Sequence, residues 1–102
     1  MTPLFVQYGS EDDIIAGCRA KKAAAQEKLY AQYAGRMFAL CCRYVKNKME
    51  AEDVMVSAFT KIFEKIDQFR NEGSFEGWMR RVVVNEALTY LRKNKAMYLE
   101  TD

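Results

Sequence analysis

The stretch FTKIFEKIDQFRNEGSFEGWMRRVVVNEALTYLRK, residues 59–93, decides the fold class. Apolar residues recur at steps of three and four near both of its ends, which is the spacing of a helix that buries one face. Between them, residues 70–74 bring Asn, Gly and Ser together, a composition typical of a loop. The stretch therefore predicts two helices, about 49–68 and about 75–95, joined by a short loop. Their predicted core residues are Met55, Phe59, Ile62, Phe63 and Ile66 in the first helix and Phe75, Met79, Val82, Val83 and Tyr90 in the second.

Two further helices are predicted upstream, about 10–21 and about 23–46. Ser10 and Ser74 stand where helices should begin, and serine is a preferred N-cap. Gly35 lies inside the longer helix, where it would permit a close contact between helices. One face of that helix carries Tyr30, Tyr33, Met37, Leu40, Cys41 and Tyr44. With one proline and five glycines, the chain is predicted to be all-α. We expect one domain over 1–102, structured over about 10–95, as a compact bundle of about four helices.

The residue inventory argues against an enzyme. The chain has no histidine, which is the most frequent general base, and no Walker loop. Cys18, Cys41 and Cys42 do not have the spacing of a zinc site, so we expect no metal and no cofactor. Glu50, Glu52 and Asp53 could ligate magnesium, but acidic residues at a helix start are accounted for by the helix dipole. Unpaired thiols and the lack of a signal peptide or apolar span predict a cytoplasmic protein.

Charge is unevenly distributed along a chain whose net charge is only +2. Acidic side chains outnumber basic ones in residues 1–20, whereas basic side chains predominate in residues 75–95. A basic excess of this kind suits an anionic partner. The alternative is an ordinary solvated helix face, and charge alone does not separate the two.

A polar row is predicted on the fourth helix. At 100° per residue, Arg81, Asn85, Thr89 and Arg92 fall within about 80° of one another, beside the apolar stripe. Arginine and asparagine can contact phosphates and base edges. A solvated helix face is the alternative interpretation of this row as well.

Aromatic residues flank the predicted loop. Phe69, Phe75 and Trp78 surround the polar segment, and such aromatics can stack on unpaired bases. The alternative is that all three pack in the core. Helical phase favours the core for Phe75, while Trp78 could serve both purposes.

Beyond these features, the chain resembles the second conserved region of extracytoplasmic-function (ECF) sigma factors. The matching pieces are LYAQY at 29–33, RYVKN at 43–47, AEDV at 51–54, FTKIFEKIDQFR at 59–70, GSFEGWMRRVVVN at 73–85 and ALTYLRK at 87–93. The resemblance implies a helical domain that docks on the clamp helices of RNA polymerase's largest subunit. It also implies that the domain binds the minus-ten promoter element as single-stranded non-template DNA and helps to melt it.

By position, the resemblance assigns two sets of residues. Glu52 and Asp53 would lie on the polymerase-docking surface. The loop would hold an extruded base, and the fourth helix would contact the minus-ten DNA. The predicted DNA-binding residues are Phe69, Arg70, Asn71, Ser74, Trp78, Arg81, Asn85 and Arg92.

The sequence also departs from the family pattern. Val56 and Ser57 stand where many relatives have a Gln-acid pair, which would weaken docking or move it to neighbouring residues. Lys21-Lys22 replaces a frequent Gly-Asp. Nothing after Lys95 supplies the helix-turn-helix of complete members, so we expect a fragment that binds promoter DNA weakly without polymerase. A second hypothesis is a protein-interaction module without DNA contact, held by an anti-sigma factor.

Overall fold

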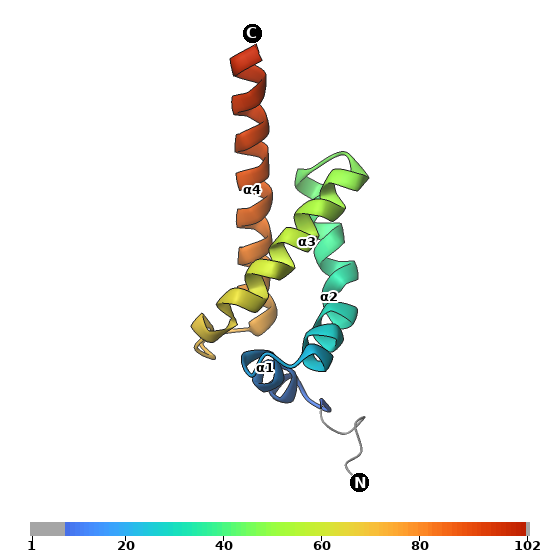
Figure 1. Cartoon of the computed structure of the whole chain (residues 1–102), viewed down its shortest axis with the longest axis vertical. Helices are drawn as coiled ribbons and strands as arrows, with labels where there is room; N and C mark the ends of the chain where they lie inside the picture. The colour runs from blue at the N-terminus through green and yellow to red at the C-terminus, as the bar shows by residue number, and fades with distance from the viewer. Residues whose placement is uncertain (1–7, 102) are drawn as a thin grey trace.

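The computed structural model describes the backbone of residues 8–101 and the side chains of residues 8–95. Within this range every regular element is helical, which confirms the predicted all-α class. Residues 1–7 and Asp102 of the predicted domain lie outside the described residues. The elements, shown in Figure 1, are α1 (Glu11–Arg19), α2 (Ala23–Tyr44), α3 (Lys48–Lys65), the 3-10 helix η2 (Ile66–Gln68) and α4 (Phe75–Thr101).

Three helices begin at side-chain caps. The Ser10 hydroxyl accepts a hydrogen bond from the Asp13 N–H at 3.2 Å, and the Ser74 hydroxyl accepts one from the Gly77 N–H at 2.7 Å. Both caps were predicted. The Asn47 side chain does the same for α3, accepting from the Glu50 N–H at 3.0 Å. Each cap satisfies one of the N–H groups that a helix start leaves without a partner, so these local residues set where the helices begin.

The turn from α1 to α2 is a Schellman motif with lysine at its strained position. The Lys22 N–H donates to the Gly17 carbonyl at 2.9 Å, and the Lys21 N–H donates to the Cys18 carbonyl at 3.0 Å. Lys21 has φ 61°, in the left-handed region that favours glycine. A Cβ added to Gly17 would lie 2.5 Å from the Ala25 Cβ, so the absence of a side chain lets α1 pack closely on α2. The departure at Lys21 thus carries a backbone strain that glycine would not.

One hydrophobic core joins the helices. Helix α3 packs against α2 and α4, and α2 also packs against α1 and α4. In Figure 1, α1 lies at the end of the bundle where α4 begins, and α4 extends past the α2–α3 turn. Burial raises the pKa of the Cys18 and Cys41 thiols to about 11, so both remain protonated hydrophobes at neutral pH. The principal core residues are Ile14, Leu29, Met37, Phe59, Ile62, Ile66, Met79 and Val83.

The structure adds detail to the predicted packing. Tyr30 is 38% exposed and only touches the core edge-on, with its ring 4.9 Å from that of Phe59. Gly35 makes no close helix contact, since an added Cβ would meet nothing within 4 Å. The third helix turns 3-10 at Ile66, and the fourth continues beyond the predicted end at Lys95. Tyr30 lies at the rim of the apolar face of α2. Helical spacing alone does not tell whether a residue at such a rim is buried or exposed.

Glu86 lies at the edge of the apolar stripe of α4. Its side chain is only 15% exposed, and its carboxylate pairs with Lys61 Nζ of α3 at 2.6 Å. A carboxylate can be largely buried when a cation accompanies it. The pair therefore ties α3 to α4 at a point where the apolar stripe is interrupted.

None of the helices within residues 8–101 is both long and apolar enough to cross a membrane. The same part of the chain has no group of three or more His, Cys, Asp or Glu side chains that could hold a metal ion.

Candidate nucleic-acid interface

The loop between η2 and α4 has a defined conformation. The Phe69 N–H donates to the Ile66 carbonyl at 3.2 Å, which ends the 3-10 turn. Asn71 has φ 60° and Gly73 has φ 81°, so two of the loop residues adopt left-handed backbone. Glycine does so without strain, and asparagine is among the residues that tolerate it best. This alternation folds residues 69–74 into a tight arch that ends at the Ser74 cap.

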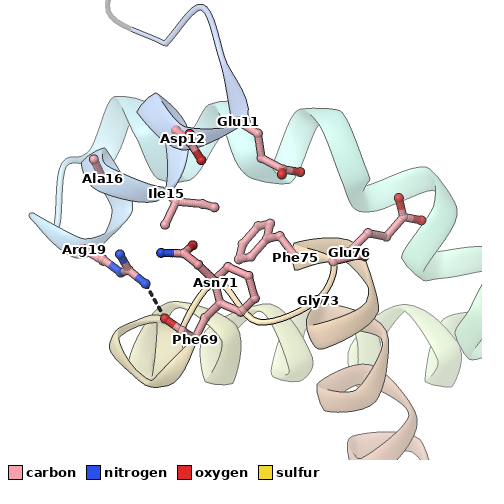
Figure 2. A pocket seen from close by; sticks show the side chains of 11 residues that line it. Glu11, Asp12, Ile15, Ala16, Arg19, Phe69, Asn71, Gly73, Phe75 and Glu76 are labelled. Atoms are coloured by element: carbon pink, nitrogen blue, oxygen red, sulfur yellow. Dashed lines mark hydrogen bonds between the residues drawn. The ribbon is translucent and has the colours of Figure 1, made fainter.

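Arg19 of α1 holds this arch from the other side. Its guanidinium donates to the Phe69 carbonyl, as drawn in Figure 2, and its Nε lies 3.5 Å from the Ile66 carbonyl. The Phe69 carbonyl lies just past the end of η2, where a helical turn leaves acceptors without intrahelical donors. The Ile66 carbonyl also accepts from the Phe69 N–H. Arg19 therefore positions the loop relative to α1, although the residues are 50 positions apart in the sequence.

A cavity of about 650 Å³ opens between α1, the loop and the start of α4. This volume is within the usual range for small-ligand pockets. Figure 2 shows the Asn71 amide pointing towards α1, with the Phe69 and Phe75 rings beside it. The wall contributed by α1 was not predicted. The cavity is lined by Glu11, Asp12, Ile15, Ala16, Arg19, Phe69, Asn71, Gly73, Ser74, Phe75 and Glu76.

The three aromatics form one cluster beneath the loop. Phe69 and Phe75 are buried and meet edge-on with centroids 5.1 Å apart, while Trp78 stacks on Phe75 at 5.8 Å with an 18° angle between the planes. Trp78 is half-buried. The core interpretation therefore holds for the two phenylalanines, which still line the cavity, whereas Trp78 packs against both and does not line it. Arg70 is exposed but does not line the cavity.

The predicted polar row is present on α4. Arg81, Asn85 and Arg92 are exposed, and Thr89 is half-buried. The Thr89 hydroxyl donates to the Asn85 carbonyl at 2.9 Å and accepts from Arg92 at 3.4 Å. Among the described residues, the side chains of Arg81 and Asn85 make no hydrogen bond or ion pair, so both are free to bind an external group. From Arg81 to Arg92 the row spans about 16 Å along the helix.

Polar contacts brace the α1 side of the cavity. The Tyr33 hydroxyl donates to Glu11 Oε2 at 2.9 Å. Burial, together with this hydrogen bond, raises the pKa of Tyr33 to about 12. Glu76 of α4 pairs with Arg36 at 2.7 Å and with Arg80 at 3.5 Å. Glu11 and Glu76 are therefore engaged in joining α1, α2 and α4.

The predicted docking residues lie on a different surface. Glu52 and Asp53 are exposed on α3, beside Met49 at 78% exposure and Val56 at 50%. A groove of about 350 Å³ separates this part of α3 from α2. The α3 surface thus combines exposed apolar side chains with acidic ones, a composition suited to a protein partner. The groove is lined by Ala34, Gly35, Phe38, Lys48, Met49, Glu52 and Met55.

Comparison with known proteins identifies the family. The family model for Sigma-70 region 2 matches residues 29–97, more than half of the chain. The chain belongs to the sigma-70 region 2 family. This membership confirms the resemblance noted in the sequence. Because region 2 is a DNA-binding transcription domain, it also confirms the prediction that the chain is not an enzyme.

Individual relatives of this region 2 domain carry ECF sigma factor names. It is 30% identical over 72% of its length to ECF RNA polymerase sigma factor SigE of Mycolicibacterium smegmatis, and 33% identical over 65% to SigW of Bacillus subtilis. It is 35% identical over 62% to the sigma-E factor of Escherichia coli K12. These matches cover 28%, 35% and 32% of the relatives, so the chain spans about a third of their length.

A solved structure shares the fold of this region 2 domain. It is an NMR structure of an engineered region 2 of sigmaE in complex with GTAAAA. The two superimpose with a TM-score of 0.77 and 26% identity, covering 84% of this chain and 90% of the other.

Proposed function

We propose that this region 2 domain recognises the minus-ten promoter element as single-stranded non-template DNA and assists promoter melting. The observation that carries the proposal is the cavity beside the start of α4. The polar row lies further along the same helix. An extruded base would enter the cavity while the strand's backbone follows Arg81, Asn85 and Arg92 along α4. Phe69, Asn71 and Ser74 would contact the base. Trp78 would support the Phe75 ring on which it stacks, and Arg70 would contact the phosphates.

The energetics fit a domain that captures an opened base. Unstacking and extruding a base costs a few kcal/mol, and one stacking contact with an aromatic side chain returns about 1–3 kcal/mol. A loop already held by Arg19 and the Ser74 cap needs little further ordering when a base arrives. Phosphate contacts along α4 would supply the remaining free energy and would make binding salt-dependent.

We further propose that α3 docks on the clamp helices of RNA polymerase's largest subunit. Glu52 and Asp53 would face basic groups of the clamp, and Met49 and Val56 would supply apolar contact. Where relatives have a Gln-acid pair, Val56 contributes only apolar area, so docking would rely on the two acids. An anti-sigma factor is a further candidate partner for this surface.

The test is fluorescence anisotropy of a labelled single strand containing GTAAAA, the sequence bound by the engineered neighbour. The domain is titrated with and without a clamp-helix fragment, at two salt concentrations. Asn85→Ala should weaken binding about 5–20-fold, by the loss of one or two hydrogen bonds. Gln32→Ala, which removes an exposed amide from α2, is the matched control and should leave binding unchanged.

Two outcomes would contradict the proposal. Equal binding by the wild type and Asn85→Ala would remove α4 from the DNA-binding surface. Clamp binding without any DNA response would favour the second hypothesis, a protein-interaction module, which the exposed Met49 and Val56 also suit.

A further inference from the structure

Helix α1 forms one wall of the cavity, and its chemistry is independent of the family match. The Sigma-70 region 2 match begins at residue 29, whereas α1 comprises Glu11–Arg19. The loop wall supplies an amide, a hydroxyl and two aromatic rings. The α1 wall supplies two carboxylates and an arginine. The base that the cavity accepts should therefore depend on α1 as well as on the loop.

Most polar groups around the cavity are already engaged. Arg19 donates to backbone carbonyls of η2 and the loop, and Glu76 pairs with two arginines. The Ser74 hydroxyl oxygen accepts from the Gly77 N–H, and one Glu11 oxygen accepts from Tyr33. The polar groups left over are thus mainly acceptors on the α1 wall.

Two cavity side chains have no hydrogen bond or ion pair among the described residues: the Asp12 carboxylate and the Asn71 amide. They extend from opposite walls of the cavity, as Figure 2 shows. An amide both donates and accepts, so Asn71 can adapt to any base edge. A carboxylate at neutral pH only accepts, so Asp12 cannot adapt. Of the two, Asp12 is the side chain that can discriminate between bases.

We propose that Asp12, with the free oxygen of Glu11 beside it, selects an extruded base that carries an exocyclic amino group and rejects thymine. This inference rests on the proposed function. An amino group offers two N–H donors to a wall that presents carboxylate acceptors, and cytosine N4 and adenine N6 are such groups. Thymine offers one N–H between two carbonyl oxygens, and a carboxylate that approaches it is repelled by both.

The same wall determines which part of the strand can enter. Asp12 and Glu11, which line the cavity, repel phosphates, which therefore remain on the α4 side near Arg81. The base points towards α1 and the backbone runs along α4. The acidic start of α1 thus keeps phosphates out of the cavity and lets a base enter. A basic wall would instead attract phosphates.

The experiment first locates the base that enters the cavity. A labelled single strand is made with an abasic site at each position in turn, and affinity is measured by anisotropy. The abasic penalty is the loss of affinity that an abasic site causes at a given position. The position whose penalty shrinks most in Asn71→Ala is the one whose base occupies the cavity. That position is then filled with adenine or purine, and separately with cytosine or 2-pyrimidinone. Each pair differs only by the exocyclic amino group.

The wild type should bind the amino-bearing base about tenfold more tightly than its partner, the effect of one hydrogen bond to a charged group. Asp12→Asn should reduce this ratio to about twofold and should improve thymine binding, because the new amide can donate to thymine O4. Asp13→Asn removes the same charge from the same turn of α1 but does not line the cavity. It should leave the ratio unchanged.

Two different failures can be told apart. If an abasic penalty is found but the ratio is near one, or is unchanged in Asp12→Asn, this inference is wrong and the proposed function stands. If no position shows an abasic penalty, no base enters the cavity, and both the base-capture step and this inference fail. Thermal melting of each variant checks that the fold is intact.

Discussion

Replacing Arg19 tests whether α1 holds the loop in its binding conformation. In Arg19→Met the aliphatic stem remains, while the charge and the donors to the Ile66 and Phe69 carbonyls are lost. A hydrogen bond from a charged donor contributes about 1.5–3 kcal/mol. The Ile66 contact, at 3.5 Å, adds little. Because Arg19 is half-buried, we expect a loss of about 1.5–2 kcal/mol in the free energy of unfolding, at the lower end of that range.

For a domain of this size, such a loss lowers the melting temperature by about 6–12 °C. Urea unfolding followed by circular dichroism measures it directly. Arg43→Met, at an exposed position of α2, removes the same charge and is the control. Arg19→Lys keeps the charge but cannot form the same fork, and should lie between wild type and Arg19→Met.

The same variant should change DNA binding in a specific way. A loosened loop weakens capture of the extruded base, so the affinity difference between an intact and an abasic strand shrinks. Contacts along α4 persist, so binding retains its salt dependence. The reasoning is refuted if Arg19→Met is no less stable than Arg43→Met, or if it keeps the full abasic penalty.

Three further predictions concern stability. Lys21→Gly should raise the free energy of unfolding by about 0.5–1 kcal/mol, because glycine relieves the left-handed strain but also adds freedom to the unfolded chain; an unchanged melting temperature would contradict this. Trp78→Ala should cost about 2–3 kcal/mol in urea unfolding, less than a fully buried aromatic, since Trp78 is half-buried on Phe75. A loss below about 1 kcal/mol would mean that the ring contributes mainly to binding. The raised pKa of Cys18 and Cys41 means that the folded state holds these protons more tightly than the unfolded state, so stability is complete below pH 9.0 and falls as pH rises towards about 11. Urea titrations across this range should show that fall, and Cys41→Ala should reduce it.

Local features of this chain were predictable from the sequence because their causes are local. Ser10 and Ser74 cap helices by bonding to N–H groups three residues away, a distance that the sequence displays directly. The helical spacing of Phe59, Ile62 and Ile66 likewise follows from backbone geometry alone. The exposed row at Arg81 and Asn85 follows from the same periodicity.

The rims of the helical faces were less predictable. Tyr30 lies on the stripe by its spacing, yet it is exposed and meets α3 only edge-on at Phe59. The position of Glu86 at an edge is decided by Lys61 of α3, which only the folded chain brings beside it. Burial of a residue at the rim of a helical face depends on how the neighbouring helices cross that helix. The sequence of a single helix does not contain this information.

The cavity shows most clearly which features follow from the sequence and which require the tertiary structure. From the sequence alone came the all-α class, the helix starts, the loop at 69–74 and the membership suggested by ordered motifs. The tertiary structure alone decided that α1 closes the site, because Arg19 reaches a carbonyl 50 residues away and brings Asp12 opposite Asn71. Caps and periodicity arise from backbone geometry within a few residues and are written in sequence order. The wall of the cavity arises from the packing of α1 against α2 and η2, and only the folded chain brings those segments together.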